Sequence, residues 1–137
     1  MQEELDTPSV VRYGGSYELS VCPKPIIGMT KGLAYCGGAV LSSSLDFSIG
    51  CEHSSFRFLA AAYVRINCTW TLPNHLGWPM AKKLLFAGRV VEAEEAYRIG
   101  LLNHLAPCDR LRDKTTEIAT TITKNRRDSV TGARALL

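Results

Sequence analysis

The chain has 137 residues, of which 46% are hydrophobic, enough for one ordinary globular domain and too few for two. Its net charge of +3 is small, and the basic residues are not interleaved with aromatic ones, which argues against nucleic-acid binding. No apolar run approaches the length that spans a bilayer, and the first residues are acidic where a secretory signal would be basic. We therefore expect no nucleic-acid partner and no membrane association.

The cysteines and histidines predict neither a disulfide framework nor a metal site. The five cysteines are odd in number, widely spaced and never in a C-x-x-C pair, and the three histidines lack a ligand-like spacing to one another or to the cysteines. This pattern favours reduced thiols in a cytoplasmic protein without a metal.

The first elements predicted along the chain form a β-α-β unit. Residues 1–22 are expected to be partly ordered and to finish with a short helix, which the following prolines end. A strand over 25–29 leads into a glycine-rich bend at 32–38, and a helix follows from about 38 to 44. Residues 45–50 alternate apolar and polar side chains, as a half-buried strand does. The two strands should be parallel and joined by a right-handed crossover.

The remainder of the chain is predicted to be mainly helical. A short strand over 54–58 and a helical turn after it lead into a loop through 67–71. Proline in the first turn and glycine past the end mark one later helix, and acidic residues at the start mark the next. We expect helices over 79–87, 92–99, 109–125 and from 129 onwards, with a short strand over 101–105.

The glycine-rich bend carries its chemistry in the backbone. Gly32, Gly37 and Gly38 let the main chain pass close to a ligand. The free N–H groups in the first turn of the following helix point outward, at the positive end of the helix dipole. Such a turn can hold an oxyanion, but a Gly-Gly pair before a helix is often only a turn, and the bend alone leaves both interpretations open.

Six segments add context to the bend: PKPIIGMTKGLAYCGGAV, LDFSI, SSFRF, LPNHLG, LLFAGR and EAEEAYRIGLLNHLAP. In this order they resemble motifs of the crotonase superfamily, the enoyl-CoA hydratases and isomerases. The family motifs are a Pro-Lys-Pro strand, Asn-Gly-x-Ala-x-Gly-Gly-Gly, a Cys-Asp strand, a Phe-Gly segment, Leu-Pro-Arg-x-x-Gly, Leu-x-Thr-Gly-Arg and Ala-x-Glu-Ala-x-x-x-Gly-Leu-Val. The resemblance runs collinearly from about residue 23 to 107. It implies an α/β, crotonase-like fold with a β-β-α spiral core.

The resemblance also implies binding of an acyl-CoA thioester, with coenzyme A as part of the substrate and no other cofactor, as in fatty acid metabolism. Family members stabilise an enolate-like oxyanion with two backbone N–H groups, each worth roughly a hundredfold to a thousandfold in rate. One comes from the middle glycine of the triplet, which falls on Gly37. The neighbouring positions expected to contact substrate are Lys31, Ala34, Cys36 and Gly38. Cys36 replaces the first glycine of the triplet, and it is either a reactive thiol at a helix N-terminus or a small apolar filler.

The two family glutamates that handle water and proton in hydratases are replaced. By the resemblance, their positions fall on Val40 and Ala60, neither of which can accept or donate a proton. The nearest carboxylates in the sequence are Asp46, expected to be structural, and Glu52, in a polar turn. We therefore expect weak or lost hydratase activity.

Complete family members are roughly twice as long as this chain, so the resemblance covers the middle portion of the fold and implies truncation at both ends. We divide the sequence into an N-terminal segment (1–22), a crotonase-like core (23–108) and the start of a C-terminal helical region (109–137). Exposed sheet edges in such a piece favour a homo-oligomer, a trimer or hexamer as in the family. The alternative function is that of a catalytically inactive crotonase-fold assembly or binding protein.

Overall fold

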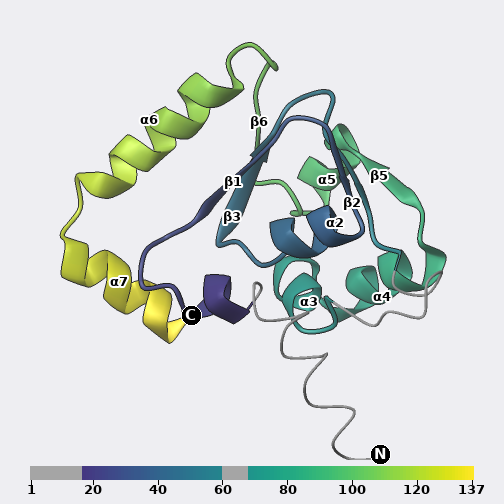
Figure 1. The fold of residues 1–137 in the computed structure, drawn as a ribbon, viewed down its shortest axis with the longest axis horizontal. Helices are drawn as coiled ribbons and strands as arrows, with labels where there is room; N and C mark the ends of the chain where they lie inside the picture. The colour runs from purple at the N-terminus through teal and green to yellow at the C-terminus, as the bar shows by residue number, and fades with distance from the viewer. Residues whose placement is uncertain (1–16, 60–67) are drawn as a thin grey trace, which may run out of the picture.

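The structure is a computed structural model that describes residues 17–59 and 68–137. Its strands form two sheets of three strands each (Figure 1). The first sheet has the order β1 (Ile27–Thr30), β3 (Phe47–Gly50) and β6 (His104–Leu105), and all three strands are parallel. The second has the order β2 (Leu33–Tyr35), β4 (Ser55–Arg57) and β5 (Val90–Glu92), with β5 antiparallel to β4.

The two sheets grow together as a spiral. Each of the first two passes of the chain adds one strand to the first sheet and then one to the second, so that β1 pairs with β3 while β2 pairs with β4. The register aligns Ile27 with Phe47 in one sheet and Leu33 with Ser55 in the other. Helix α2 (Gly37–Ser42) connects the two passes. This is a β-β-α spiral, and it confirms the predicted α/β, crotonase-like fold class.

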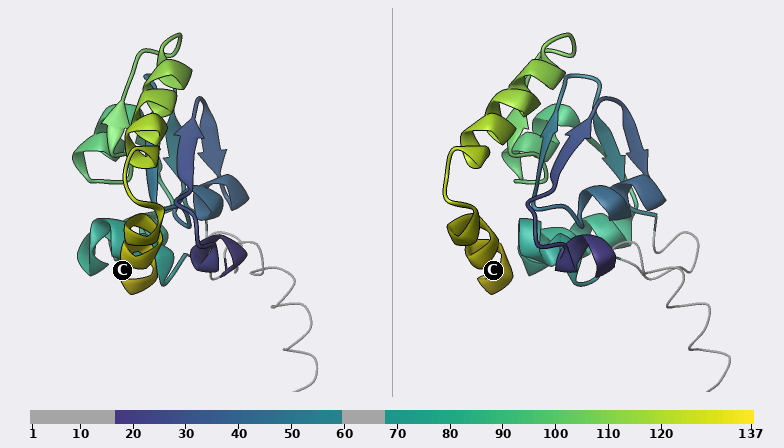
Figure 2. Two further views of the ribbon diagram at one scale, coloured as in Figure 1. Left: turned by 90° about the vertical axis from the view of Figure 1, so that its left-hand side faces the viewer. Right: turned by 60° about the vertical axis from the view of Figure 1, so that its left-hand side comes forward.

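The helices form two groups (Figures 1 and 2). Those that pack with the second sheet are α3 (Thr71–Leu76), α4 (Trp78–Ala87) and α5 (Ala93–Arg98), together with α2. The C-terminal pair is α6 (Leu111–Thr123) and α7 (Arg127–Leu136), which lie on the other side of the first sheet. Residues 17–21 are also helical and lie beside the end of α7. No helix in residues 17–59 and 68–137 is long and apolar enough to cross a membrane.

The larger hydrophobic cluster, called here the main core, lies between the second sheet and helices α2 to α5. Its fully buried side chains include Phe56 of β4, Leu72 of α3 and Leu84 of α4. Ala34 of β2 and Ala39 of α2 belong to the same cluster. The elements on both sides of the bend between β2 and α2 therefore pack into the main core.

The smaller cluster, called here the minor core, lies under α6. Its buried members are Ile49, Cys51 and Leu111, with Cys108 and Ile118 among the half-buried residues packed against it. The thirteen residues of α6 thus attach to the first sheet through few buried side chains. The main core buries many more side chains than the minor core.

Helix α7 is held by a polar contact. Arg134 of α7 donates hydrogen bonds to the carbonyl oxygens of Leu19, Ser20 and Cys22, and its Nε lies 2.9 Å from the Asp46 carboxylate. Its side chain is only 12% exposed. The carbonyls at the end of a short helix have no partners within that helix, so the guanidinium caps residues 17–21. One side chain thus joins α7, the N-terminal helical residues and the loop before β3.

Most predicted elements are confirmed, and the structure differs from the predictions at three places. Residues 33–35 lie inside the predicted bend but form β2, because they find partners in β4. Residues 71–76 form α3, whereas residue 71 was placed in a loop and the rest was assigned no element. Residues 90–92 form β5, which was not predicted. The predicted helical turn after residue 59 falls mostly outside the described residues.

Candidate active site

The candidate site is the turn between β2 and α2, which Cys36 makes. Cys36 has φ 48° and ψ −113°, a conformation that glycine adopts freely and other residues rarely do. Its N–H donates to the Arg57 carbonyl at 3.1 Å, which extends the β2–β4 pairing by one residue. Its carbonyl accepts the first bond of α2, from the Val40 N–H at 3.1 Å. Both bonds hold Cys36 in a backbone conformation that it would not otherwise favour.

The strained turn leaves Gly37 and Gly38 at the exposed start of α2. Neither N–H has a backbone acceptor among the described residues, as expected for the first turn of a helix. A Cβ added at Gly37 would meet nothing within 4 Å, and one at Gly38 would lie 3.8 Å from the Ala34 side chain. The turn therefore has free N–H groups at an exposed position, and buried Ala34 lies next to Gly38.

Cys36 and Lys31 lie in different surroundings. Cys36 is exposed, so the interpretation as a small apolar filler is wrong. Lys31 is also exposed but precedes β2, so the length of that strand separates it from Gly37. The Lys31 carbonyl accepts a hydrogen bond from the Cys51 thiol at 3.5 Å, which places it beside the minor core. The structure brings together Ala34, Cys36, Gly37 and Gly38, and leaves Lys31 apart.

The comparisons with known proteins agree with this architecture. The family model for enoyl-CoA hydratase/isomerase matches residues 7–137. The chain belongs to the enoyl-CoA hydratase/isomerase family. It is 33% identical over 99 residues to a crotonyl-CoA hydratase of Syntrophomonas wolfei, an alignment that covers 70% of this chain and 38% of that protein.

Solved structures of the family share the fold. The enoyl-CoA hydratase of Bacillus anthracis matches with a TM-score of 0.84 and 29% identity, over 96% of this chain and 55% of that one. A monofunctional enoyl CoA isomerase of M. smegmatis matches with a TM-score of 0.78 and 28% identity, over 88% and 58%. The chain thus spans about half the length of the family members it matches.

Within the enoyl-CoA hydratase/isomerase family, the resemblance places one glutamate on Val40. Val40 is half-buried in α2 and packs against the main core, and its carbonyl accepts bonds from Ser43 Oγ and Ser44 Oγ at 3.0 and 2.8 Å. The surroundings of this side chain are apolar. The second glutamate position, Ala60, lies outside the described residues.

The two carboxylates considered as replacement bases have other surroundings. Asp46 Oδ2 accepts the Ile26 N–H at 2.6 Å and the carboxylate pairs with Arg134, so its role is structural, as expected. Glu52 is exposed in the turn after β3 and lies 3.7 Å from the His53 ring. Neither carboxylate is on the β2–α2 turn. The described residues contain no cluster of His, Cys, Asp and Glu that could hold a metal ion.

Two family-like motifs are joined by an ion pair that the sequence did not predict. Arg89, from LLFAGR, binds Glu95, from EAEEAY, through two hydrogen bonds of 2.7 and 2.5 Å. These bonds lower the pKa of the Glu95 carboxyl and raise that of Arg89. The pair fixes the start of α5 to the turn that follows α4, so it supports the main core and not the candidate turn.

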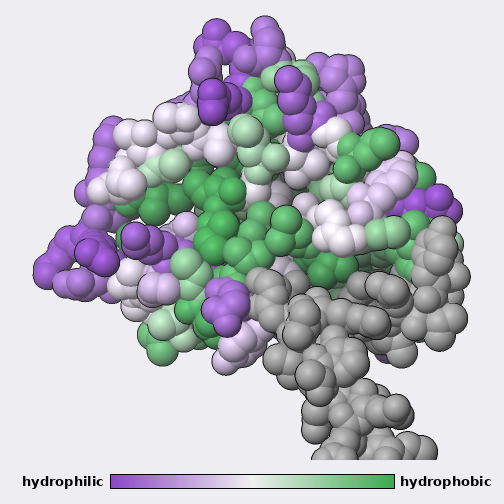
Figure 3. All heavy atoms as spheres, in the orientation of Figure 1, coloured by the Kyte–Doolittle hydropathy of each residue, from purple (hydrophilic) through white to green (hydrophobic). Residues whose placement is uncertain are grey.

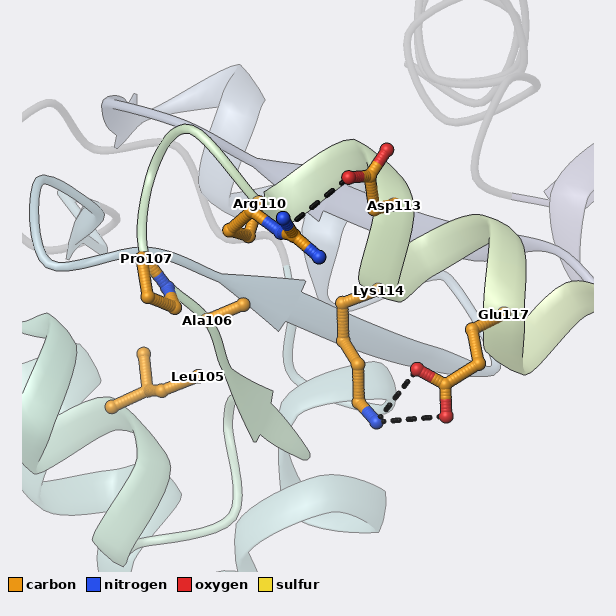
Figure 4. A pocket seen from close by; sticks show the side chains of 7 residues that line it. All are labelled: Leu105, Ala106, Pro107, Arg110, Asp113, Lys114 and Glu117. Atoms are coloured by element: carbon orange, nitrogen blue, oxygen red, sulfur yellow. Dashed lines mark hydrogen bonds and ion pairs between the residues drawn. The ribbon is translucent and has the colours of Figure 1, made fainter.

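A hollow of about 260 Å³ lies between α6 and the segment after β6, away from the candidate turn (Figure 4). Its cations are Arg110, 3.5 Å from Asp113, and Lys114, 3.1 Å from Glu117. Each cation therefore has an acidic neighbour one helical turn away. The hollow has no net positive charge with which to attract a phosphate group.

Proposed function

We propose that the turn before α2 binds the thioester carbonyl of an acyl-CoA, with the Gly37 N–H donating to the oxygen as it gains negative charge. One observation carries the proposal: the Gly37 N–H at the exposed start of α2 has no backbone acceptor among the described residues. A donor held in place before the reaction needs no reorganisation when charge develops on the oxygen. Family membership supports the substrate class, and coenzyme A enters as part of the substrate.

In this proposal the chain is an enoyl-CoA hydratase/isomerase-like protein whose hydration activity is weak or lost. Hydration requires a group that orients water and a group that moves a proton. Val40 occupies one of the expected positions and packs against the main core, and Ala60 carries no titratable group at the other. An oxyanion donor without these groups can polarise a bound thioester but cannot activate water.

The binding test is calorimetric titration of the full chain with crotonyl-CoA and, separately, with free coenzyme A. We expect the thioester to bind more tightly than free coenzyme A. Gly37→Ala should weaken thioester binding about twofold to tenfold, since the bound carbonyl is neutral and a lost or displaced hydrogen bond between neutral groups costs about 0.5–1.5 kcal/mol. The added methyl group would stand in the open space beside the N–H.

Gly132→Ala is the matched control. Gly132 is also a helical glycine whose added Cβ meets nothing within 4 Å, but it lies in α7. Both variants should fold, because alanine suits a helix better than glycine. Equal thioester binding by Gly37→Ala and Gly132→Ala would refute the role of Gly37. The unmodified chain should also hydrate crotonyl-CoA slowly or not at all, which the loss of the substrate's ultraviolet absorbance measures. Rapid hydration would refute the proposal that its activity is weak or lost.

A second candidate function is that of a catalytically inactive assembly protein. Large apolar side chains are exposed on several elements, among them Met29 of β1 (50%), Leu33 of β2 (75%) and Phe86 of α4 (76%). Figure 3 shows apolar residues gathered across the middle of one face. This candidate predicts a defined homo-oligomer, a trimer or hexamer, whose sedimentation is unchanged by crotonyl-CoA. A folded chain that sediments in this way and does not bind the thioester would favour it over the first candidate.

A further inference from the structure

Two cysteines far apart in the sequence meet beneath α6. Cys51 directly follows β3, and Cys108 follows β6 by three residues. The two strands are parallel neighbours, with Gly50 aligned to Leu105, and the Ala106 N–H donates to the Gly50 carbonyl at 3.0 Å. This pairing carries the chain after β6 along the end of β3. It brings both cysteines into the minor core, where half-buried Cys108 packs against the buried cluster that contains Cys51.

The two thiols differ in their access to solvent. Cys51 is completely buried, with its N–H bonded to Ser54 Oγ at 2.9 Å and its thiol donating to the Lys31 carbonyl. Cys108 is only half-buried. A small oxidant from solvent can therefore reach Cys108 but not Cys51. This is the arrangement of an attacking thiol beside a resolving thiol.

We propose that Cys51 and Cys108 form an oxidant-sensitive dithiol, a modification site that closes to a disulfide when the chain meets hydrogen peroxide. Both cysteines are free in the structure, which is the reduced form of the pair. The proposal does not depend on acyl-CoA binding, because the dithiol lies at the minor core and the candidate turn at the main core.

The reaction balances in two steps. The Cys108 thiolate attacks one oxygen of the peroxide, the O–O bond breaks, and the hydroxide that leaves takes up a proton to become water. The Cys51 thiolate then attacks the sulfur of the Cys108 sulfenic acid, the S–S bond forms, and the second hydroxide leaves as water. The two thiols together lose two electrons and two protons, and the peroxide takes up both.

The local charges set the pH dependence of this reaction. The hydrogen bond with Cys51, followed by burial, raises the pKa of the Cys108 thiol; nearby Glu52 also raises it, and Lys31 opposes the shift. With a raised pKa, the Cys108 thiol should be mostly protonated at neutral pH. Because only the thiolate attacks peroxide, the reaction should then be slow. The rate of disulfide formation should rise as the pH is raised above neutral.

The consequence of oxidation would be a covalent staple between the first sheet and the segment that enters α6. The bond would close a loop of more than fifty residues, which restricts the unfolded chain substantially. It would join the sheet to α6 at the place where few buried side chains hold them together. We expect oxidation to raise the melting temperature by about 5 to 15 °C.

The test is peptide mapping of the full chain after peroxide treatment without reduction. Trypsin would leave Cys36 and Cys51 on one peptide, 32–57, and Cys108 on another, 99–110, so the mapping is done on Cys36→Ser. Cys36 is exposed, and its replacement also removes a competing thiol. We expect the two peptides to be linked and the mass of the chain to fall by that of two hydrogen atoms. The melting temperature should rise on oxidation and return to its original value after reduction with dithiothreitol.

Two further variants in the Cys36→Ser background complete the design. Adding Cys108→Ser, at a half-buried position that tolerates the change, should abolish both the link and the shift in melting temperature. Adding Cys22→Ser, outside the minor core, should leave both in place. The proposal is overturned if the folded Cys36→Ser chain shows no link between Cys51 and Cys108, or if the shift persists in the Cys108→Ser variant.

Discussion

The main core and the minor core stabilise the molecule in different ways. The main core buries side chains from the second sheet and four helices, and it holds four of the six largest fully buried residues: Phe56, Leu72, Leu84 and Leu102. The minor core has three buried residues, Ile49, Cys51 and Leu111, and the C-terminal helices also depend on polar contacts such as that of Arg134. The candidate turn belongs to the well-packed half. The comparison indicates that the turn should persist when the C-terminal helices detach.

The largest expected effect is on the main core. Phe56→Ala removes a completely buried ring from β4 and should lower the free energy of unfolding by about 3–5 kcal/mol. Chemical denaturation followed by circular dichroism measures it. Phe86→Ala, which removes a ring that is 76% exposed, is the control and should change stability by less than about 0.5 kcal/mol. Similar losses in both variants would show that the main core does not dominate stability.

Arg134→Ala should detach α7 while leaving the main core folded. The variant loses the bonds to the Leu19, Ser20 and Cys22 carbonyls and the pair with Asp46, a local cost of about 2–3 kcal/mol. Hydrogen exchange should show lost protection in α7 and unchanged protection in β4.

Arg127→Ala, at an exposed position in the same helix, is the control for Arg134→Ala and should preserve protection in α7. If Arg134→Ala also reduces protection in β4, the two cores unfold as one unit and the comparison fails.

Cys36→Gly should stabilise the candidate turn. A non-glycine residue at φ 48° and ψ −113° carries a strain of about 1–3 kcal/mol, which glycine relieves. Part of this gain is offset because glycine increases the conformational entropy of the unfolded chain. The expected gain is about 1 kcal/mol, measured by denaturation. Cys36→Ala keeps the Cβ and should show no such gain. Equal stability of the glycine and alanine variants would contradict strain at this residue.

The smallest expected effect concerns the Arg89–Glu95 pair. Because the Arg89 hydrogen bonds lower the pKa of Glu95, this carboxylate stabilises the fold above its unfolded pKa of about 4.3, and the contribution is lost as the pH falls through the lower folded value. Glu95→Gln should cost about 0.5–1 kcal/mol at pH 7, since both side chains are partly exposed, and nothing at low pH. Denaturation at several pH values measures this difference.

Glu94→Gln replaces the neighbouring, exposed carboxylate and serves as the control. Its stability should follow that of the unmodified chain at every pH. A Glu95→Gln difference that does not change with pH would contradict the assignment to the Glu95 charge.

Local sequence patterns predicted the elements that are determined locally. The β-α-β unit around β1, α2 and β3 and the helices α4 to α7 follow from apolar periodicity and from proline and glycine at their ends. The three-residue strands β2 and β5 were missed because each exists only through pairing with β4, more than twenty residues away. Helix α3 was not predicted, and its Pro73 lies in the first turn, where proline is tolerated.

The candidate site shows the same division. Free N–H groups at the start of α2 were expected from the glycine pair before a helix, and the choice of Gly37 among them came from the family resemblance. The backbone angles of Cys36 were not, because they depend on its bond to Arg57 across the second sheet. Nor could the sequence show that Arg134 pairs with Asp46, 88 positions away, or that Lys31 lies beside Cys51.

The first strand of each sheet, β1 or β2, has one edge to which another strand could be added. In the described part of the chain, β1 and β2 each stand at the end of a sheet, and each pairs with a strand on one side only. Both carry an exposed apolar side chain, Met29 and Leu33. Unpaired backbone groups beside apolar side chains invite any extended peptide to add a strand. A further β-β-α unit could therefore extend both sheets at once. An unfolded chain could pair with the same edges and cause aggregation, so the purified protein is best kept at low concentration.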